Sequence, residues 1–400
     1  MMIIGVVGKP NVGKSTFFKA LTLANVEIAN YPFATIKPNS GVAHVRIDCV
    51  DKEFNVQCNP REGFCVNHQR FVPIQVIDVA GLVPGAYEGK GMGNQFLDDL
   101  RQADALIHVI DVSGSTNEKG EPVPSGSYDP REDVRFLEKE LDMWYLGILK
   151  KGWEKFARTI QQEHGDIKKA LGKQLSGLGV TEDMVASGLK KQDLIEKQPT
   201  QWNDDELYEL ASYLRQETKP TIIAANKIDV PVSKKNLIKI KEEFKDHIIV
   251  GCSAESELAL KEASKHNLID YIAGNDDFTI SKQDTLSEKQ KTALNFIKEN
   301  ILKSYGSTGV QEVINKAAFD LLKLIAIFPG GVNKLEDQYG NVLPDCFLLP
   351  EESTALDFAY KIHSDLGDNF IRAIDVKTKR TVGKEHKLKH RDVVEIIADK

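Results

Sequence analysis

The sequence predicts an α/β fold in which helices cover a mostly parallel sheet. Nearly continuous apolar runs, typical of strands buried on both faces, occur at residues 2–7, 72–79, 105–112, 221–225 and 247–250. Helical stretches separate runs of this kind, as the connections of a parallel sheet require. The first run leads into a glycine-rich loop and then into a helical pattern from Phe17 onward, which is a strand, a loop and a helix in succession.

The composition limits the size and the surroundings of this fold. A chain of 400 residues with 41% hydrophobic and 28% charged residues is long enough for two or three domains. The formal net charge of -7 argues against binding nucleic acid with the whole surface, and we expect no sequence-specific DNA binding. Five sparse cysteines are unlike a disulfide framework. The chain shows no basic leader and no apolar run of 18 residues, so we expect a cytoplasmic protein without a membrane partner.

Two segments depart from the rhythm of strands and helices and predict further domains. Asp129, Pro130 and Glu132 signal a helix start, and apolar residues follow at helical spacing. These are Leu137, Leu141, Trp144, Tyr145, Ile148 and Leu149. We interpret this segment as an inserted helical hairpin. Short strands and turns near the C-terminus predict a small α+β module. The predicted domains are residues 1–128 with 220–324, the insert 129–219, and the module 325–400.

A phosphate-binding loop is the strongest motif. Residues 8–15, GKPNVGKS, match G-x-x-x-x-G-K-[ST], and the strand before and helix after them are the required context. The glycines let backbone N–H groups converge on phosphate at a helix N-terminus. Lys14 would neutralise the terminal phosphates, and the Ser15 hydroxyl would bind Mg²⁺. The predicted nucleotide-binding residues of the loop are Gly8, Asn11, Val12, Gly13, Lys14, Ser15 and Thr16.

Two motifs at the ends of later apolar runs make this site specific. Residues 78–81, DVAG, form a DxxG element, in which Asp78 would hold Mg²⁺ through water and the Gly81 amide would contact the γ-phosphate. Residues 226–229, NKID, form an NKxD sequence. The Asp229 carboxylate can accept both N–H donors on one edge of guanine, whereas adenine offers it no matching pair. The wrong base would leave buried polar groups unpaired, so discrimination can be strong.

Two weaker elements complete the set by their order along the chain. Ser253 and Ala254 follow the run at 247–250, and a backbone N–H there could bond O6 of guanine. Thr35, in NYPFAT, is placed where a switch threonine would bind Mg²⁺ and the γ-phosphate. The predicted metal ligands are Ser15, Thr35 and Asp78. The predicted base-site residues are Asn226, Lys227, Asp229, Ser253 and Ala254.

These residues resemble the TRAFAC-type GTPases, and most closely the YchF-like branch of the Obg family in an archaeal form. GKPNVGKST, NYPFAT, DVAGLVPGAYEGKGMGNQFLDDLRQAD and NKID carry the resemblance, and residues 325–400 are similar to a TGS domain, a ubiquitin-like module. The resemblance implies a GTP hydrolase that works as a conformational switch in translation or at the ribosome. Two alternatives remain: an ATPase of the same branch, or a ribosome or RNA adapter with little turnover.

Departures from related sequences refine the expected chemistry. Many YchF relatives have a degenerate base motif and favour ATP, whereas the intact NKID predicts guanine here. Leu82 stands where Ras-like proteins carry a water-orienting glutamine, which predicts slow intrinsic hydrolysis. Asn11 is similar to asparagines that coordinate K⁺ beside the phosphates, although asparagine also suits a tight loop. The predicted catalytic residues are Lys14, Thr35, Gly81 and Asn11, and the candidate cofactors are Mg²⁺ and K⁺.

Three weaker signals have plain structural readings beside the functional ones. Cys49, Cys58, Cys65 and His68 could close a zinc site, but ordinary reduced cysteines in an inserted hairpin are the favoured interpretation. Eight basic residues near the C-terminus could mark an RNA-binding face or a solvated rim: Arg372, Lys377, Lys379, Arg380, Lys384, Lys387, Lys389 and Arg391. His108 and His363 lie in apolar patterns, and we predict both to be core residues.

Overall fold

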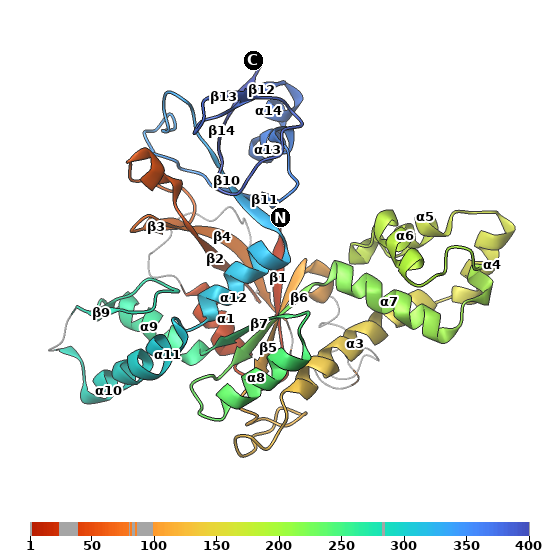
Figure 1. Ribbon diagram of the computed structural model, residues 1–400, viewed down its shortest axis with the longest axis horizontal. Helices are drawn as coiled ribbons and strands as arrows, with labels where there is room; N and C mark the ends of the chain where they lie inside the picture. The colour runs from red at the N-terminus through yellow and green to blue at the C-terminus, as the bar shows by residue number, and fades with distance from the viewer. Residues whose placement is uncertain are drawn as a thin grey trace. The chain divides into compact units, whose positions relative to one another are not determined.

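The computed structural model in Figure 1 describes residues 2–23, 39–79, 81, 85, 99–281 and 285–399. The chain divides into two compact units. The first comprises Met1–Phe18 and Val76–Glu255, and the second comprises Lys19–Gln75 and Ser256–Lys400. Thr35 and Leu82, whose roles were predicted from the sequence, lie outside the described residues.

The first unit contains the predicted parallel sheet, with strand order β4-β1-β5-β6-β7. Its strands are β1 (Ile3–Val7), the end of β4 (Gln69–Asp78), β5 (Ala105–Asp111), β6 (Thr221–Asn226) and β7 (Ile248–Cys252). β1, β5, β6 and β7 pair in parallel. Every residue of β5 is buried, as expected for a strand covered on both faces. Because parallel strands end at one edge of the sheet, the loops after β1, β5, β6 and β7 gather there.

The helices of the first unit follow these strands. They are α1 (Lys14–Thr22, of which the start lies in this unit), α3 (Arg131–Lys150), α4 (Trp153–Gln162), α5 (Ile167–Gln174), α6 (Glu182–Lys191), α7 (Asp204–Thr218), α8 (Ser233–Glu243) and the first residues of α9 (Ala254–Lys265), with 3-10 turns η3 (Ser176–Leu178) and η4 (Pro199–Gln201). No helix among the described residues combines the length and apolar character needed to cross a bilayer.

The predicted helical insert is a bundle rather than a simple hairpin, because α4, α5 and α6 stand between α3 and α7 in the chain. α3 and α7 lie side by side (Figure 1), joined by a buried ion pair of 2.7 Å between Arg215 Nε and Asp142 Oδ1. The Trp153 and Trp202 rings stack with their centroids 5.3 Å apart. The predicted apolar stripe of α3 is buried except for Ile148, which is half-buried.

The start of α3 also follows the sequence signal, shifted by one residue. The Asp129 carboxylate accepts the backbone N–H of Arg131, the first helical residue, at 3.1 Å. Pro130 therefore precedes the helix instead of opening it, and the capping acid still satisfies a backbone donor of the first turn.

The second unit holds two further sheets and short helices. β3 pairs antiparallel with β4, and β2 lies on the other side of β4. The elements are β2 (Ser40–Asp48), η1 (Val50–Phe54), β3 (Phe64–Val66), β8 (Ile269–Asp270), β9 (Thr279–Ile280), α10 (Glu288–Phe296), η6 (Ile297–Leu302), α11 (Lys303–Tyr305), α12 (Val310–Lys316), η7 (Ala317–Leu321), β10 (Leu324–Pro329), β11 (Phe347–Pro350), α13 (Ala355–Ile362), α14 (Ser364–Asp368), β12 (Phe370–Asp375), β13 (Arg380–Val382) and β14 (Val393–Ala398).

The C-terminal module is the predicted α+β structure. Its strands follow the order β11-β10-β14-β12-β13, with β10 and β14 parallel and the other neighbours antiparallel. Ile327, Phe358 and Ala373 are fully buried between this sheet and α13. Residues 19–75 belong to the same compact unit as this module, so the units cut across the predicted domains, whose boundaries remain predictions.

One of the two histidine predictions is wrong. His108 in β5 is buried, as predicted, with 3% of its surface exposed. The apolar helical pattern around His363 is instead broken at this residue, which has extended backbone between α13 and α14. The His363 side chain is 62% exposed and accepts the Asp365 backbone N–H at 3.2 Å. An imidazole can cap a helix, and this local hydrogen bond competes with the helical pattern.

Candidate nucleotide-binding site

The phosphate loop has the backbone that its glycines predict. Gly13 has a φ of 92°, which favours glycine, and a Cβ there would lie 2.3 Å from Nδ2 of Asn226. A Cβ on Gly8 would lie 2.5 Å from the backbone oxygen of Val109 in β5. The loop is therefore pressed against β5 and the end of β6, and neither contact leaves room for a side chain.

Lys14 and Asp78 lie together at the mouth of this loop. Lys14 Nζ forms an ion pair with Asp78 Oδ1, and the two side chains are 13% and 24% exposed. Ser15, the next residue of α1, is exposed. Gly81 lies beside the loop, because a Cβ there would be 3.8 Å from Cγ of Pro10. A cation, a carboxylate and a hydroxyl, which the sequence predicts to serve phosphate and Mg²⁺, thus gather at one edge.

Asn226 ties the base-recognition motif to the phosphate loop. Its Nδ2 donates to the Val12 backbone oxygen at 2.9 Å, and its Oδ1 accepts the Ala254 backbone N–H at 3.0 Å. Asn226 is buried and sits at the end of β6. Its amide therefore bridges three segments of the site. These bonds use both the donor and the acceptor group of the buried amide within the protein, and a contact of Asn226 with the nucleotide stays a prediction.

Asp229 is also held from the neighbouring strand end. Ser253, which is fully buried after β7, donates its hydroxyl to Asp229 Oδ1 at 2.8 Å. The Ile228 backbone N–H bonds the Cys252 oxygen at 3.2 Å. This leaves the carboxylate half-buried at the edge of the sheet and fixes its direction. A carboxylate oriented by the protein can accept two N–H donors without first losing conformational freedom.

Asp111, which is not among the residues predicted from the sequence, organises the loop after β5. The Asp111 carboxylate is fully buried and accepts hydrogen bonds from the hydroxyls of Ser113 and Ser115. It also forms an ion pair with Lys227 Nζ at 2.9 Å. Burial alone would raise the pKa of Asp111, but the hydrogen bonds from Ser113, Lys227 and Ser115 outweigh it and lower the pKa. Lys227 also donates to the Asn11 backbone oxygen at 3.1 Å. Asp111 could have been found from the sequence, because it is an acid at the carboxyl end of a buried strand, where ligand sites of parallel sheets lie.

Lys9, inside the phosphate loop, is a second residue that sequence reasoning passed over. Its ammonium is buried, bonds Asp133 Oδ1 at 2.7 Å and the Thr116 oxygen at 3.1 Å, and lies 3.9 Å from the Tyr128 ring centroid. Burial raises the pKa of Asp133 to about 6, and the ammonium of Lys9 acts against this increase. Lys9 thereby anchors the loop to the start of α3.

Asn11 contacts the segment between β5 and α3. Its Nδ2 donates to the Gly120 backbone oxygen at 2.9 Å, and its φ of 62° lies in the left-handed region that asparagine tolerates. A Cβ on Gly120 would lie 2.6 Å from the Pro10 backbone oxygen. These contacts are compatible with Asn11 as a residue that suits a tight loop and with Asn11 as a ligand of K⁺.

The fold and the site define a P-loop nucleotide-binding protein of the GTPase class. A family model described as a 50S ribosome-binding GTPase matches residues 3–141, a model described as the Obg-like GTPase YGR210-like, G4 motif-containing domain matches residues 224–331, and a TGS domain model matches residues 339–398. The chain belongs to the YchF-like branch of the Obg family of GTPases, and it carries a C-terminal TGS domain.

Similar proteins span nearly the whole chain. A GTP-binding protein of Methanocaldococcus jannaschii is 52% identical over 100% of this chain and 99% of its own, and the ribosome-binding ATPase YchF of Bacillus subtilis is 30% identical over 92% and 87%. The crystal structure of a GTP-binding protein from Pyrococcus horikoshii covers 100% of both chains at 41% identity, with a TM-score of 0.79. A YchF GTPase structure from Schizosaccharomyces pombe, 21% identical with a TM-score of 0.59 over 99% and 97%, shows the same fold.

Proposed function

We propose that the protein binds GTP with Mg²⁺ and hydrolyses it to GDP and phosphate as a conformational switch. The observation that carries this proposal is the fixed Asp229 carboxylate, which Ser253 orients at the same sheet edge as the phosphate loop. An acceptor held there suits the two N–H donors of guanine. Gly81 and Thr35 would sense the γ-phosphate, with Thr35 assigned from its motif alone.

The residues at the phosphate end fit Mg²⁺. Ser15 and Asp78 supply hydroxyl and carboxylate oxygens, the donors that Mg²⁺ prefers, and Asp78 already lies against Lys14. When bound, Mg²⁺ would neutralise charge on the β- and γ-phosphates. Lys14 would exchange its bond to Asp78 for phosphate oxygens, and the backbone of the phosphate loop would hold the β-phosphate. Catalysis would consist of positioning and charge neutralisation by these groups.

The decisive experiment compares guanine with adenine nucleotides on the full-length protein. We expect GDP to bind at least about a hundredfold more tightly than ADP, because adenine leaves the Asp229 acceptor unpaired. The variant D229A should lose most of this preference, measured by calorimetric titration of both diphosphates. The matched control D246N, at an exposed acid, should keep it. Equal affinity of the wild type for GDP and ADP would contradict the guanine assignment.

An ATPase is the second candidate, because the name of the Bacillus subtilis relative describes an ATPase. Tight binding of ADP with weak binding of GDP would favour it. Phosphate release from both triphosphates, measured in the same preparation, then separates a hydrolase from an adapter that binds nucleotide without turnover. Release at the background rate, with and without ribosomes, would support the adapter.

We also propose that the protein works at the ribosome in the cytoplasm. Relatives that match more than nine-tenths of this chain are named ribosome-binding ATPases. On the C-terminal module, Lys377 and Arg391 form ion pairs with Glu53, and Lys387 pairs with Glu352. The other five predicted basic residues are exposed: Arg372, Lys379, Arg380, Lys384 and Lys389. Exposed cations on one module suit contacts with RNA phosphates.

A further inference from the structure

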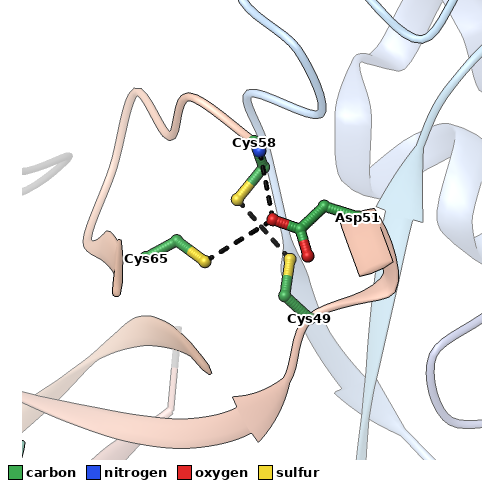
Figure 2. A group of neighbouring side chains, drawn as sticks. All are labelled: Cys49, Asp51, Cys58 and Cys65. Carbon is green, nitrogen blue, oxygen red and sulfur yellow. Dashed lines mark hydrogen bonds between the residues drawn. The ribbon is translucent and has the colours of Figure 1, made fainter. Parts of the chain in front are cut away.

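Three cysteines and an aspartate meet in the segment between β2 and β4. Cys49 immediately precedes the turn η1 and Asp51 lies in it, while Cys58 lies on the loop that leads into β3 and Cys65 lies in β3 itself. Figure 2 shows their side chains pointing toward one another from these separate stretches of chain. Asp51, Cys49 and Cys58 are at most 5% exposed, and Cys65 is half-buried. Burying a charged carboxylate among thiols costs free energy of folding unless a cation or hydrogen-bond donors balance its charge.

The distances among the four donor atoms suit one tetrahedral metal ion. All four lie within 4.8 Å of one another. Cys49 Sγ and Cys58 Sγ are 3.5 Å apart, and Cys65 Sγ is 3.8 Å from Asp51 Oδ2. Two thiolates on tetrahedral zinc are roughly 3.8 Å apart, and a thiolate and a carboxylate oxygen roughly 3.5 Å. The distances between the donor atoms in this protein are therefore close to those between the ligands of a tetrahedral zinc ion.

Neighbouring groups orient the four donors as a second coordination shell does. Asp51 Oδ1 bonds His68 Nδ1 at 2.9 Å, and Asp51 Oδ2 accepts the Cys58 backbone N–H at 3.1 Å. The buried Arg70 donates an N–H toward Cys58 Sγ at 3.7 Å. Second-shell bonds of this kind fix the direction of ligands, and a nearby guanidinium offsets the negative charge of three thiolates. His68 thus supports Asp51 instead of serving as the fourth ligand that the sequence spacing suggested.

We propose that Cys49, Asp51, Cys58 and Cys65 form a structural zinc site. Thiolate donors select zinc over Mg²⁺ or Ca²⁺, and four protein donors close the tetrahedron without an open position for substrate. A disulfide explains less, because a Cys49–Cys58 bond would need the sulfurs near 2.05 Å and would leave Cys65 and the buried Asp51 without a role.

The site would brace a loop that contacts the TGS domain within the same compact unit. The Asn59 and Arg61 backbone N–H groups bond the oxygens of Val342 at 2.8 Å and Pro344 at 3.0 Å. Arg70 donates to the Leu343 oxygen at 3.1 Å and the Pro344 oxygen at 2.9 Å. In the chain, the ligands Cys58 and Cys65 flank Asn59 and Arg61. Zinc binding would hold the loop in the shape that these backbone bonds require.

The test measures metal in untagged full-length protein by inductively coupled plasma mass spectrometry. We expect about one zinc per chain after purification under reducing conditions, or after reconstitution with Zn²⁺. The variants C65S and D51N should bind less than about one tenth as much. The controls C346S and D48N, which change a cysteine and an acid outside the four donors, should keep the metal.

A second readout separates ligation from misfolding of a variant. Co²⁺ added in place of zinc should give the absorption bands of a tetrahedral thiolate site in the wild type, and C65S should shift them. Limited proteolysis should cut residues 55–63 faster in D51N than in D48N. Wild-type protein that binds no Zn²⁺ or Co²⁺ above the level of C65S, or a Cys49–Cys58 disulfide found in the purified protein by mass spectrometry, would overturn the proposal.

Discussion

At the scale of single residues, the site depends on groups that hold other groups in place. The Asn226 amide bonds the backbones of Val12 and Ala254. The Lys227 ammonium pairs with Asp111 and donates to the Asn11 backbone oxygen. These two residues hold the phosphate loop against the ends of β5 and β6. Substituting them would disturb both affinity and folding, because partners would be left unpaired in a buried setting.

Asn11 allows a test of the K⁺ hypothesis. The variant N11G keeps a residue suited to a φ of 62° and removes the side-chain oxygen that a cation would need. We expect wild-type GTP turnover to be at least about tenfold faster in K⁺ than in Na⁺, corresponding to about 1.4 kcal/mol of transition-state stabilisation. N11G should turn over equally in both salts. N267G, at another asparagine with positive φ, is the control; equal wild-type rates in the two salts would exclude the role.

His108 predicts a pH dependence of stability. Burial, the largest cause, lowers the pKa of His108 to about 3, below the ordinary value of 6.5. Between these values the unfolded chain binds a proton that the folded protein does not, so stability is lost as the pH falls below 6.5. This one group accounts for up to about 1.4 kcal/mol per pH unit.

The variant H108L should remove that loss. Its unfolding midpoint relative to the wild type should rise as the pH falls from 7 to 5, measured in thermal melts followed by far-ultraviolet circular dichroism. H363N, at the exposed histidine, controls for the removal of any imidazole. A difference in midpoint that stays constant with pH would refute the prediction.

At the scale of elements, the insert is held mainly by apolar packing between its helices. Leu210 in α7 is fully buried in a cluster that includes Leu141, Trp144 and Leu207. The chain's tryptophans, Trp144, Trp153 and Trp202, all lie in this segment, so their fluorescence reports selectively on its unfolding.

Truncating Leu210 should therefore weaken this bundle strongly. L210A should lower the free energy of unfolding by roughly 2–5 kcal/mol, because it removes buried methyl groups and leaves a cavity. E209A, on the exposed neighbour, should change it by less than about 0.5 kcal/mol. The measurement is urea unfolding followed by tryptophan fluorescence. Equal effects of the two substitutions would show that this packing does not limit stability.

At the scale of the whole molecule, charge is distributed unevenly. The chain is acidic overall, with a formal net charge of -7, yet exposed basic residues gather around the turn between β12 and β13. An acidic protein with such a basic region should bind a polyanion through that region, and this binding should weaken as salt increases.

Charge reversal in that turn tests ribosome association. K379E/R380E should weaken co-sedimentation with ribosomes at least about tenfold and reduce its dependence on salt, because phosphate contacts are lost. K234E/K235E, on the exposed side of α8, is the matched control. Unchanged binding by the first variant would favour a solvated rim over an RNA-binding face.

The sequence alone predicted the strand segments of the parallel sheet, the phosphate loop, the base motif and the C-terminal α+β module, whereas the order of the strands within the sheet came from the structure. These features are local: a continuous apolar run, a glycine at a positive φ or an acid after a strand can be read from neighbouring residues. The family resemblance drawn from the same motifs was confirmed by the matching models and relatives.

The tertiary structure decided the features that depend on residues far apart in the chain. Asn226 bonding Val12, Lys9 pairing with Asp133 and Asp51 completing the cysteine cluster join segments that no spacing rule connects. The prediction that His363 is a core residue was wrong for a related reason. Its side chain caps the start of α14, so the helical pattern is interrupted at this residue. Hydrogen bonds and ligand sets are satisfied wherever folding brings partners together, so their identity follows from the packed chain rather than from its local pattern.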